Sequence, residues 1–195
     1  MTSPNHHHRH EPTVTDRPPG LPRRTVLVGA GGLAAVALAG CLGGDDDERA
    51  PAEPIDLTGD WVCEVCGMVI EEHYGPAGQL FYADDSDDDP VAFDSVTELV
   101  VYHDGQGEDK RSAFVTDYSS VDYELITYDD GTHISTHAEA DAFVDATAAH
   151  YVVGSEVEGA MGEDYHPFSD AEDAEEFVDD HGGEVHSWEE LSASA

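Results

Sequence analysis

The sequence predicts an α+β protein in which two repeated ββαβ units pack as one compact domain. Two stretches, about 79–117 and 149–191, each contain two short apolar runs, one segment with helical spacing and a final apolar run. Both place a Phe directly before a helix-capping pair, as Phe93-Asp94-Ser95 and Phe168-Ser169-Asp170. About 140 residues follow Ile55, which is enough for one domain with its own core.

In the first unit we expect strands over 79–83 and 90–94, then a helix from Val96 to His103 with Ser95 as its N-cap. Two glycines end this helix, and a third strand follows over 112–116. The acidic run 84–89 lacks the spacing of a calcium loop, which favours a simple hairpin loop between the first two strands.

In the second unit the expected order is a strand over 150–154, a strand over 165–168, a helix over 171–180 and a final strand over 184–188. The segment that links the units predicts a hairpin around Asp130-Gly131, with arms 123–127 and 132–135. Apolar residues at helical spacing predict a short helix within 139–148.

The N-terminal part of the chain has the features of an export signal. Arg23-Arg24 opens an uncharged stretch that is too short and too rich in Gly and Ala for a convincing membrane span. It ends in Leu38-Ala39-Gly40-Cys41, small residues before a Cys that would carry lipid. We therefore predict a twin-arginine lipoprotein signal over 1–40, a flexible acidic tether over 41–57 and a folded domain over 58–195, although an uncleaved anchor helix is the alternative.

The acidic residues are concentrated after the predicted signal. The chain has a formal net charge of −37, and only Glu11 and Asp16 of its 44 acidic residues precede Cys41. Such self-repulsion is screened when molar salt shortens the Debye length to about 3 Å, which favours a protein adapted to a very salty medium. The near absence of basic residues excludes nucleic acid as a partner.

Sulfur ligands are the best candidates for chemistry. Cys63, Cys66 and Met68 lie within six residues, and Met161 is the one further Met after the predicted signal. Thiolate and thioether ligands select Cu(I) over harder ions. A Cys63–Cys66 disulfide and half of a zinc site are the alternatives that this spacing leaves open.

Two histidines are candidate imidazole ligands. His166 stands at the start of a predicted strand beside Pro167, and His181 stands before Gly182-Gly183. A single His is more often surface-exposed or hydrogen-bonded than a ligand, so both remain candidates.

An exported thiol–disulfide oxidoreductase using Cys63 and Cys66 is the rival function, but the Cys pair does not open a helix within a βαβ unit, where a thiolate would be activated. We therefore predict a protein that is not an enzyme.

Three pieces of the chain together resemble the NosL family of copper-binding lipoproteins. The first is residues 63–70 followed by Gly75-Pro76-Ala77-Gly78-Gln79. The second is residues 149–155 leading into Ala160-Met161-Gly162, and the third runs from Pro167-Phe168 to residues 181–185. Family members commonly have Gly-Pro before the second Met, where this chain has Gly159-Ala160.

The resemblance implies a fold of two ββαβ units and a Cu(I) metallochaperone anchored to the outer face of the cell membrane through lipid on Cys41. It further implies delivery of copper to nitrous-oxide reductase in denitrification, with help from an ABC-type assembly complex. The client and this partner come from the resemblance alone.

Overall fold

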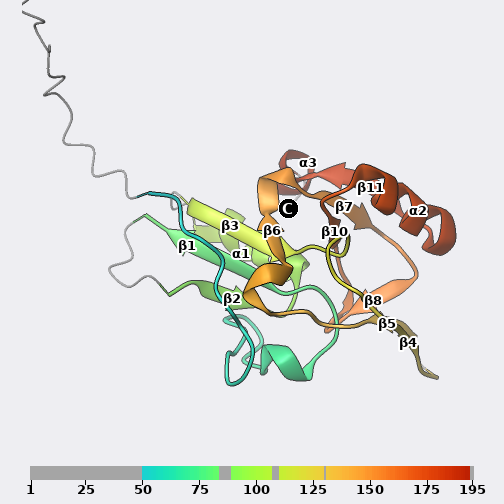
Figure 1. The fold of residues 1–195 in the computed structure, drawn as a ribbon, viewed down its shortest axis with the longest axis horizontal. Helices are drawn as coiled ribbons and strands as arrows, with labels where there is room; N and C mark the ends of the chain where they lie inside the picture. Colours follow the sequence, from blue (N-terminus) through green and yellow to red (C-terminus); the bar gives the residue numbers. More distant parts are fainter. Residues whose placement is uncertain (1–49, 84–88, 107–109, 130, 194–195) are drawn as a thin grey trace, which may run out of the picture. The chain divides into compact units, whose positions relative to one another are not determined.

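A computed structural model describes residues 50–83, 89–106, 110–129 and 131–193 (Figure 1). The predicted signal over 1–40, the lipidation candidate Cys41 and residues 84–88 of the acidic loop lie outside the described residues. In the described part of the chain, no helix is both long and apolar enough to cross a membrane.

The first sheet contains the elements of the first predicted unit and one further strand. Its order is β2-β1-β3-β6, and all neighbouring strands are antiparallel. The strands are β1 (Gly78–Tyr82), β2 (Val91–Phe93), β3 (Lys110–Thr116) and β6 (Phe143–Asp145). Helix α1 (Val96–Gln106) follows β2 and packs against β1 and β2. The backbone before α1 therefore leaves the sheet at Asp94.

The second sheet has the order β10-β7-β11 and is also antiparallel. Its strands are β7 (His150–Val153), β10 (His166–Phe168) and β11 (Glu184–Ser187). Helix α2 (Ala171–His181) begins at Asp170, whose side chain accepts a hydrogen bond from the Glu172 amide, and it packs on β7. The last element described is α3 (Trp188–Ser192).

A third sheet, β4-β5-β8-β9, joins the linking segment to a hairpin inserted between β7 and β10. Its strands are β4 (Leu125–Thr127), β5 (Thr132–Ile134), β8 (Val157–Gly159) and β9 (Gly162–Glu163). Strands β4 and β5 pair as the predicted hairpin, and β5 pairs with β8 in parallel. Because β8 and β9 belong to this third sheet, the second predicted unit contains two strands that its apolar pattern did not indicate.

The α+β class is confirmed, but the predicted helix over 139–148 is wrong. This segment forms the short 3-10 turns η2 (Ala140–Ala142) and η3 (Ala146–Ala148) on either side of strand β6. Phe143 and Val144 sit opposite Thr116 and Val115 of β3 and extend the first sheet. Aromatic and β-branched residues fit such a pleated surface, and pairing with β3 outweighs the helical spacing.

Helix α3 was missed, and the predicted final strand 184–188 ends one residue earlier. Ser187 and Glu190 form a capping box, in which the Glu190 carboxylate accepts a hydrogen bond of 2.8 Å from the Ser187 amide. The sequence signal was therefore present in the Ser-x-x-Glu spacing. Trp188 and Leu191 of α3 are buried, so this helix contributes to the hydrophobic core.

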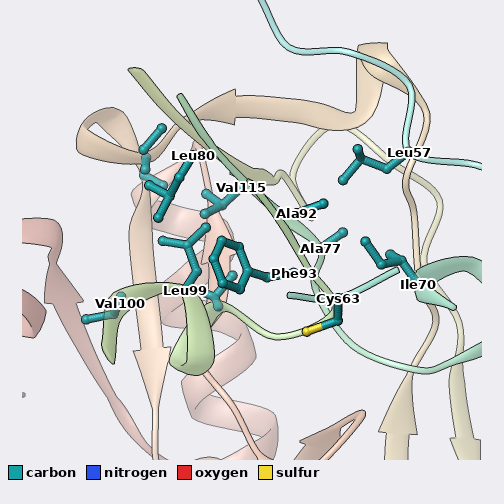
Figure 2. Packing of buried hydrophobic residues seen from close by; sticks show 14 of the residues in the cluster. Leu57, Cys63, Ile70, Ala77, Leu80, Ala92, Phe93, Leu99, Val100 and Val115 are labelled. Carbon is teal, nitrogen blue, oxygen red and sulfur yellow. The ribbon is translucent and has the colours of Figure 1, made fainter. Parts of the chain in front are cut away.

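The predicted tether extends too far into the chain. Leu57 is fully buried in the main core cluster, together with residues such as Leu80, Phe93 and Leu99 (Figure 2). Just before it, the backbone of Ile55 is held by the buried Gln79 amide, which accepts from the Ile55 N–H at 3.0 Å and donates to its carbonyl. The packed domain thus begins before residue 58.

Replacing Leu57 by Ala should therefore destabilise the whole domain. The loss of a fully buried Leu costs about 2–5 kcal/mol of unfolding free energy, because it removes apolar contact and leaves a cavity. Chemical denaturation in molar salt measures the change. Val101→Ala is the control, since Val101 is 58% exposed on α1 and its truncation should change stability by less than about 0.5 kcal/mol. A Leu57→Ala effect as small as the control would show that this segment is a tether.

Candidate metal centre

The Cys63–Met68 segment is a tight turn whose two ends are hydrogen-bonded to each other. The Cys63 amide donates to the Met68 carbonyl at 2.8 Å, and the Gly67 amide donates to the Cys63 carbonyl at 2.9 Å. Gly67 has φ of +72°, a left-handed conformation that side chains other than Gly rarely adopt. The turn is flanked by an antiparallel bridge between Val62 and Val69. Both thiols are therefore presented from one rigid loop.

The turn is fixed to the first sheet beside α1. The Glu64 amide donates to the carbonyl of Ala92 in β2 at 2.9 Å. Cys63 is buried at 2% exposure within the core cluster that Figure 2 shows, whereas Cys66 is half-buried. One thiol thus faces the protein interior and the other lies at the boundary with solvent.

Two carboxylates complete a cluster of four possible donor atoms. One Sγ or carboxylate oxygen from each of Cys63, Cys66, Asp94 and Glu98 lies within 4.8 Å of the others. The Cys63 thiol donates to Glu98 Oε2 at 3.1 Å. The Cys66 thiol lies 3.3 Å from Asp94 Oδ2 and 3.4 Å from Oδ1. The arrangement joins two soft sulfur donors to two hard oxygen donors.

Helix α1 positions both carboxylates. Asp94 is the buried residue that leaves β2, and Ser95 caps the helix by accepting a hydrogen bond from the Glu98 amide at 3.2 Å. Ser95 and Glu98 have the spacing of a capping box, in which the Glu would turn back to the cap. Here the Glu98 carboxylate instead accepts a hydrogen bond from the Cys63 thiol.

Burial keeps both thiols protonated. Loss of water raises the pKa of Cys63 well above its ordinary value, and the neighbouring Asp94 and Glu98 raise it further. Burial is also the largest cause of the raised pKa of Cys66, to which Asp94 adds. Both cysteines are free thiols, so the structure does not contain the disulfide that the spacing left open.

The other sequence candidates occupy different places. Met68 is half-buried and is the last residue of the turn. Met161 is 59% exposed, between strands β8 and β9. His166 is buried in β10, where its ring stacks on Phe177 at 5.4 Å between centroids, and burial lowers its pKa to about 4.

The donor cluster includes neither His166 nor His181. The His181 ring lies 4.7 Å from the Phe177 ring, on α2 beside the second sheet. Asp94 and Glu98 are the donors that sequence reasoning missed as a site. Asp94 and Glu98 lie on either side of Ser95, which the sequence predicts as a helix N-cap. This N-cap was the sequence signal that both carboxylates lie at the start of a helix.

The fold and the site together define a small α+β domain with a partly buried thiol–carboxylate cluster suited to a metal ion. Comparison with known proteins agrees with this class. The family model for NosL matches residues 54–195, and the chain therefore belongs to the NosL family.

Two curated relatives and one solved structure support this assignment. The copper-binding lipoprotein NosL of Stutzerimonas stutzeri is 32% identical over 168 residues, which cover 84% of this chain and 80% of the relative. That of Achromobacter cycloclastes is 31% identical over 158 residues, covering 78% and 75%. The crystal structure of the copper chaperone NosL from Shewanella denitrificans aligns with a TM-score of 0.56 and 28% identity, over 74% of this chain and 97% of that one.

The Cys66 pKa should respond to the charge on Asp94. Asp94→Asn removes a negative charge beside the thiol, so the pKa of Cys66 should fall and its alkylation by iodoacetamide should begin at lower pH. Peptide mass spectrometry of the alkylated Cys66 measures the midpoint. Glu72→Gln, an exposed acid on the 3-10 turn η1 (Ile70–Glu72), should leave the midpoint in place. Equal midpoints in wild type and Asp94→Asn would refute this electrostatic role.

Proposed function

We propose that this protein is a Cu(I) metallochaperone in which Cys63 and Cys66 hold the ion with help from Met68 and Met161. The observation that carries the proposal is the rigid turn that places two thiols side by side and ends at Met68. Thiolate and thioether ligands favour Cu(I), and relatives at about a third identity are named copper-binding lipoproteins.

The difference in burial between the two thiols suits transfer of the ion. Cys63 is enclosed, whereas Cys66 is half-buried and its neighbours Val62 and Val65 are 50% and 51% exposed. An acceptor protein could therefore approach on the Cys66 side and exchange ligands with the ion. The half-buried Cys66 and the 59% exposed Met161 leave the proposed site open on one side, whereas a fully enclosed set of four ligands would resist such exchange.

In this proposal Asp94 and Glu98 act on protons rather than as copper ligands. Cu(I) binds thiolates, so each thiol that becomes a ligand must lose its proton. The carboxylates already accept the thiol hydrogens in the metal-free protein. They thus lie where the departing protons begin their path to solvent.

A structural zinc module is the second candidate, and the two carboxylates favour it. Two thiolates and two carboxylate oxygens make the four ligands that a closed zinc site needs, which the spacing of the cysteines alone did not supply. Metal preference therefore decides between the two functions.

The thiol environment argues against the oxidoreductase alternative. A nucleophilic cysteine needs a lowered pKa, which a helix N-terminus or a nearby cation supplies. Here burial and two carboxylates raise the pKa of Cys63, and the turn precedes η1 rather than opening a longer helix. A role outside catalysis fits these observations better.

Cu(I) binding tests the ligand set. The reduced, metal-free protein in molar salt should bind about one Cu(I), and Cys66→Ser or Met161→Ala should weaken binding more than about tenfold, or 1.4 kcal/mol. Competition with a chromophoric Cu(I) chelator measures the affinity. Val101→Ala serves as the control, because Val101 is an exposed residue of α1 outside the donor cluster.

Two results would contradict this assignment. Unchanged affinity in both ligand variants would place the copper site elsewhere in the chain. Preference for one equivalent of zinc over Cu(I), with affinity lost in Asp94→Asn and Glu98→Gln, would favour the zinc module.

We also propose that lipid on Cys41 holds the protein at the outer face of the cell membrane, and that nitrous-oxide reductase receives the copper through an ABC-type assembly complex. The twin-arginine pair, the Cys41 site and the names of the relatives support this. Cys41→Ser should release the protein from the membrane fraction.

Cells that lack the protein should make nitrous-oxide reductase with little copper. Full copper content of the reductase in such cells would refute the proposal that the reductase is the client.

Internal duplication remains part of the proposal. The first unit arranges its three strands as β2-β1-β3 and the second as β10-β7-β11, so in each unit the first strand lies between the other two. In both, a helix of 11 residues follows the second strand. This shared order supports an origin from one ββαβ unit, with β8 and β9 as a later insertion.

A further inference from the structure

We infer that Asp164 is a positioning residue, which fixes the hairpin that carries Met161 against the first turn of α1. This inference deepens the proposed function, because it rests on Met161 as a copper ligand. The Met161 hairpin is defined as residues 157–163, comprising β8, the turn Ala160-Met161 and β9.

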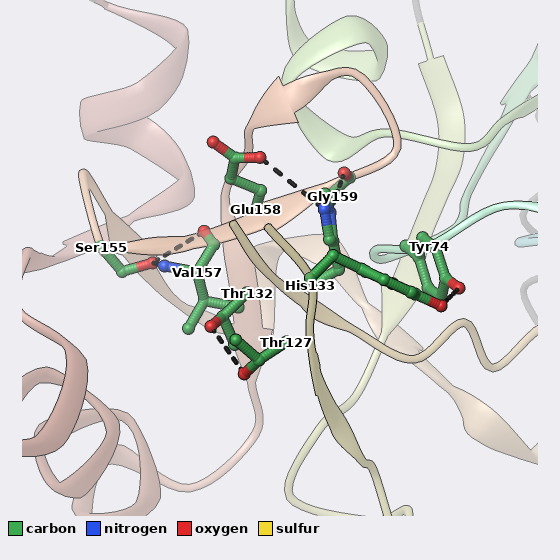
Figure 3. Close-up of polar contacts among 9 residues, drawn as sticks. Tyr74, Thr127, Thr132, His133, Ser155, Val157, Glu158 and Gly159 are labelled. Atoms are coloured by element: carbon green, nitrogen blue, oxygen red, sulfur yellow. Dashed lines mark hydrogen bonds and ion pairs between the residues drawn. The ribbon is translucent and has the colours of Figure 1, made fainter. Parts of the chain in front are cut away.

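The Met161 hairpin is a short and closely paired element. Glu158 lies opposite Glu163 and Gly159 lies opposite Gly162, so the turn between the strands has only two residues. The hairpin is held on one side by β5, through parallel pairing with β8. On that side His133 Nδ1 lies 3.4 Å from the Gly159 carbonyl and His133 Nε2 lies 3.9 Å from the Glu158 carboxylate, as Figure 3 shows.

Asp164 connects the hairpin to the helix that carries the carboxylates. It directly follows β9, and its Oδ1 accepts hydrogen bonds from the Thr97 amide at 2.9 Å and from the Thr97 hydroxyl at 3.0 Å. The Tyr165 amide donates to the same oxygen at 2.8 Å. Thr97 immediately precedes Glu98, so these bonds join the hairpin to the thiol–carboxylate cluster.

The carboxylate also packs directly on the hairpin backbone. A Cβ added at Gly159 would lie 2.6 Å from Asp164 Oδ2, and a Cβ added at Gly75 would lie 2.7 Å from the Gly159 Cα. Gly159 therefore lies between Gly75 and Asp164 with no room for a Cβ at either glycine. Gly75 follows the Cys63–Met68 turn by seven residues, so the base of the hairpin contacts the segment that leaves the turn.

The buried Asp164 carboxylate has the first-turn amide of Thr97 as a partner but no cationic side chain among its hydrogen-bond donors. Asp164 is 1% exposed, and its donors include the amides of Thr97 and Tyr165 and the Thr97 hydroxyl. Burying a carboxylate without a cationic partner is costly. What Asp164 adds is a link between segments 67 residues apart in sequence, and that link runs from the Met161 hairpin to the Cys63 partner Glu98.

A double-mutant cycle separates positioning from simple stabilisation. The four proteins are wild type, Asp164→Asn, Met161→Ala and the double variant, all as the full chain in molar salt. Cu(I) affinity is measured by chelator competition, and stability of the metal-free protein by chemical denaturation. Asn keeps the size of the side chain and one oxygen that can accept the three hydrogen bonds made to Oδ1, but it removes the carboxylate charge, so it weakens these bonds without opening a cavity.

We expect coupling in affinity and additivity in stability. Asp164→Asn should weaken Cu(I) binding about tenfold in wild type but less than about twofold once Met161 is Ala, since the ligand it positions is then gone. Its effect on unfolding should be equal in both backgrounds. Equal loss of affinity in both backgrounds, or loss in neither, would overturn the inference while leaving Met161 a ligand. Unchanged affinity in Met161→Ala alone would instead overturn the ligand set and the inference with it.

A milder variant covers the case in which Asp164→Asn does not fold. Thr97→Val removes the hydroxyl donor and keeps the amide bond, and should weaken Cu(I) binding about two- to fivefold with the same dependence on Met161. Thr147→Val is the matched control, because Thr147 makes the same pair of bonds to Asp145 on the exposed turn η3. A Thr97→Val affinity equal to that of the control would overturn the inference.

Discussion

The first turn of α1 is the constraint on which the candidate site depends. Asp94 precedes the helix, Glu98 lies within its first turn, and Asp164 accepts hydrogen bonds from Thr97 of that same turn. A helix N-terminus carries partial positive charge and unpaired amides, so it stabilises negative groups placed there. In a chain with a net charge of −37, this helix end is a place where carboxylates can lie close together inside the protein.

The same constraint shapes the chemistry of the thiols. Carboxylates at the helix end oppose the formation of thiolates, and burial of Cys63 opposes it further. The metal-free cluster is thus held in its protonated form, with each thiol donating to a carboxylate. A bound cation reverses this balance, because it supplies the positive charge that two adjacent thiolates lack. If the ion binds at this cluster as proposed, metal affinity and proton release would be coupled through the same four residues.

The sequence predicted well those features that depend on residues close together in the chain. The strands and helices around Phe93 and Phe168 follow from apolar spacing and capping residues, and the structure contains them. Strand β6 was misread because its pairing with β3 is a contact between segments distant in sequence. The Cys63 turn was visible as a motif, whereas Asp94 and Glu98 join it only through the fold, which brings Cys63 to within 3.1 Å of a residue 35 positions away.

The proposed ligands come from two segments that meet only in the folded chain. Cys63, Cys66 and Met68 lie in one turn, and Met161 lies in a hairpin that is tied to α1 by Asp164 and packed on Gly75 through Gly159. Such a site does not exist in the unfolded chain, so an ion that binds it stabilises the folded state by mass action. Transfer of the ion would remove that stabilisation and leave the hairpin held by Asp164, by β5 and by its packing on Gly75. In the proposed site, the buried link would keep the Met161 hairpin in place while the two cysteines pass the ion to a partner.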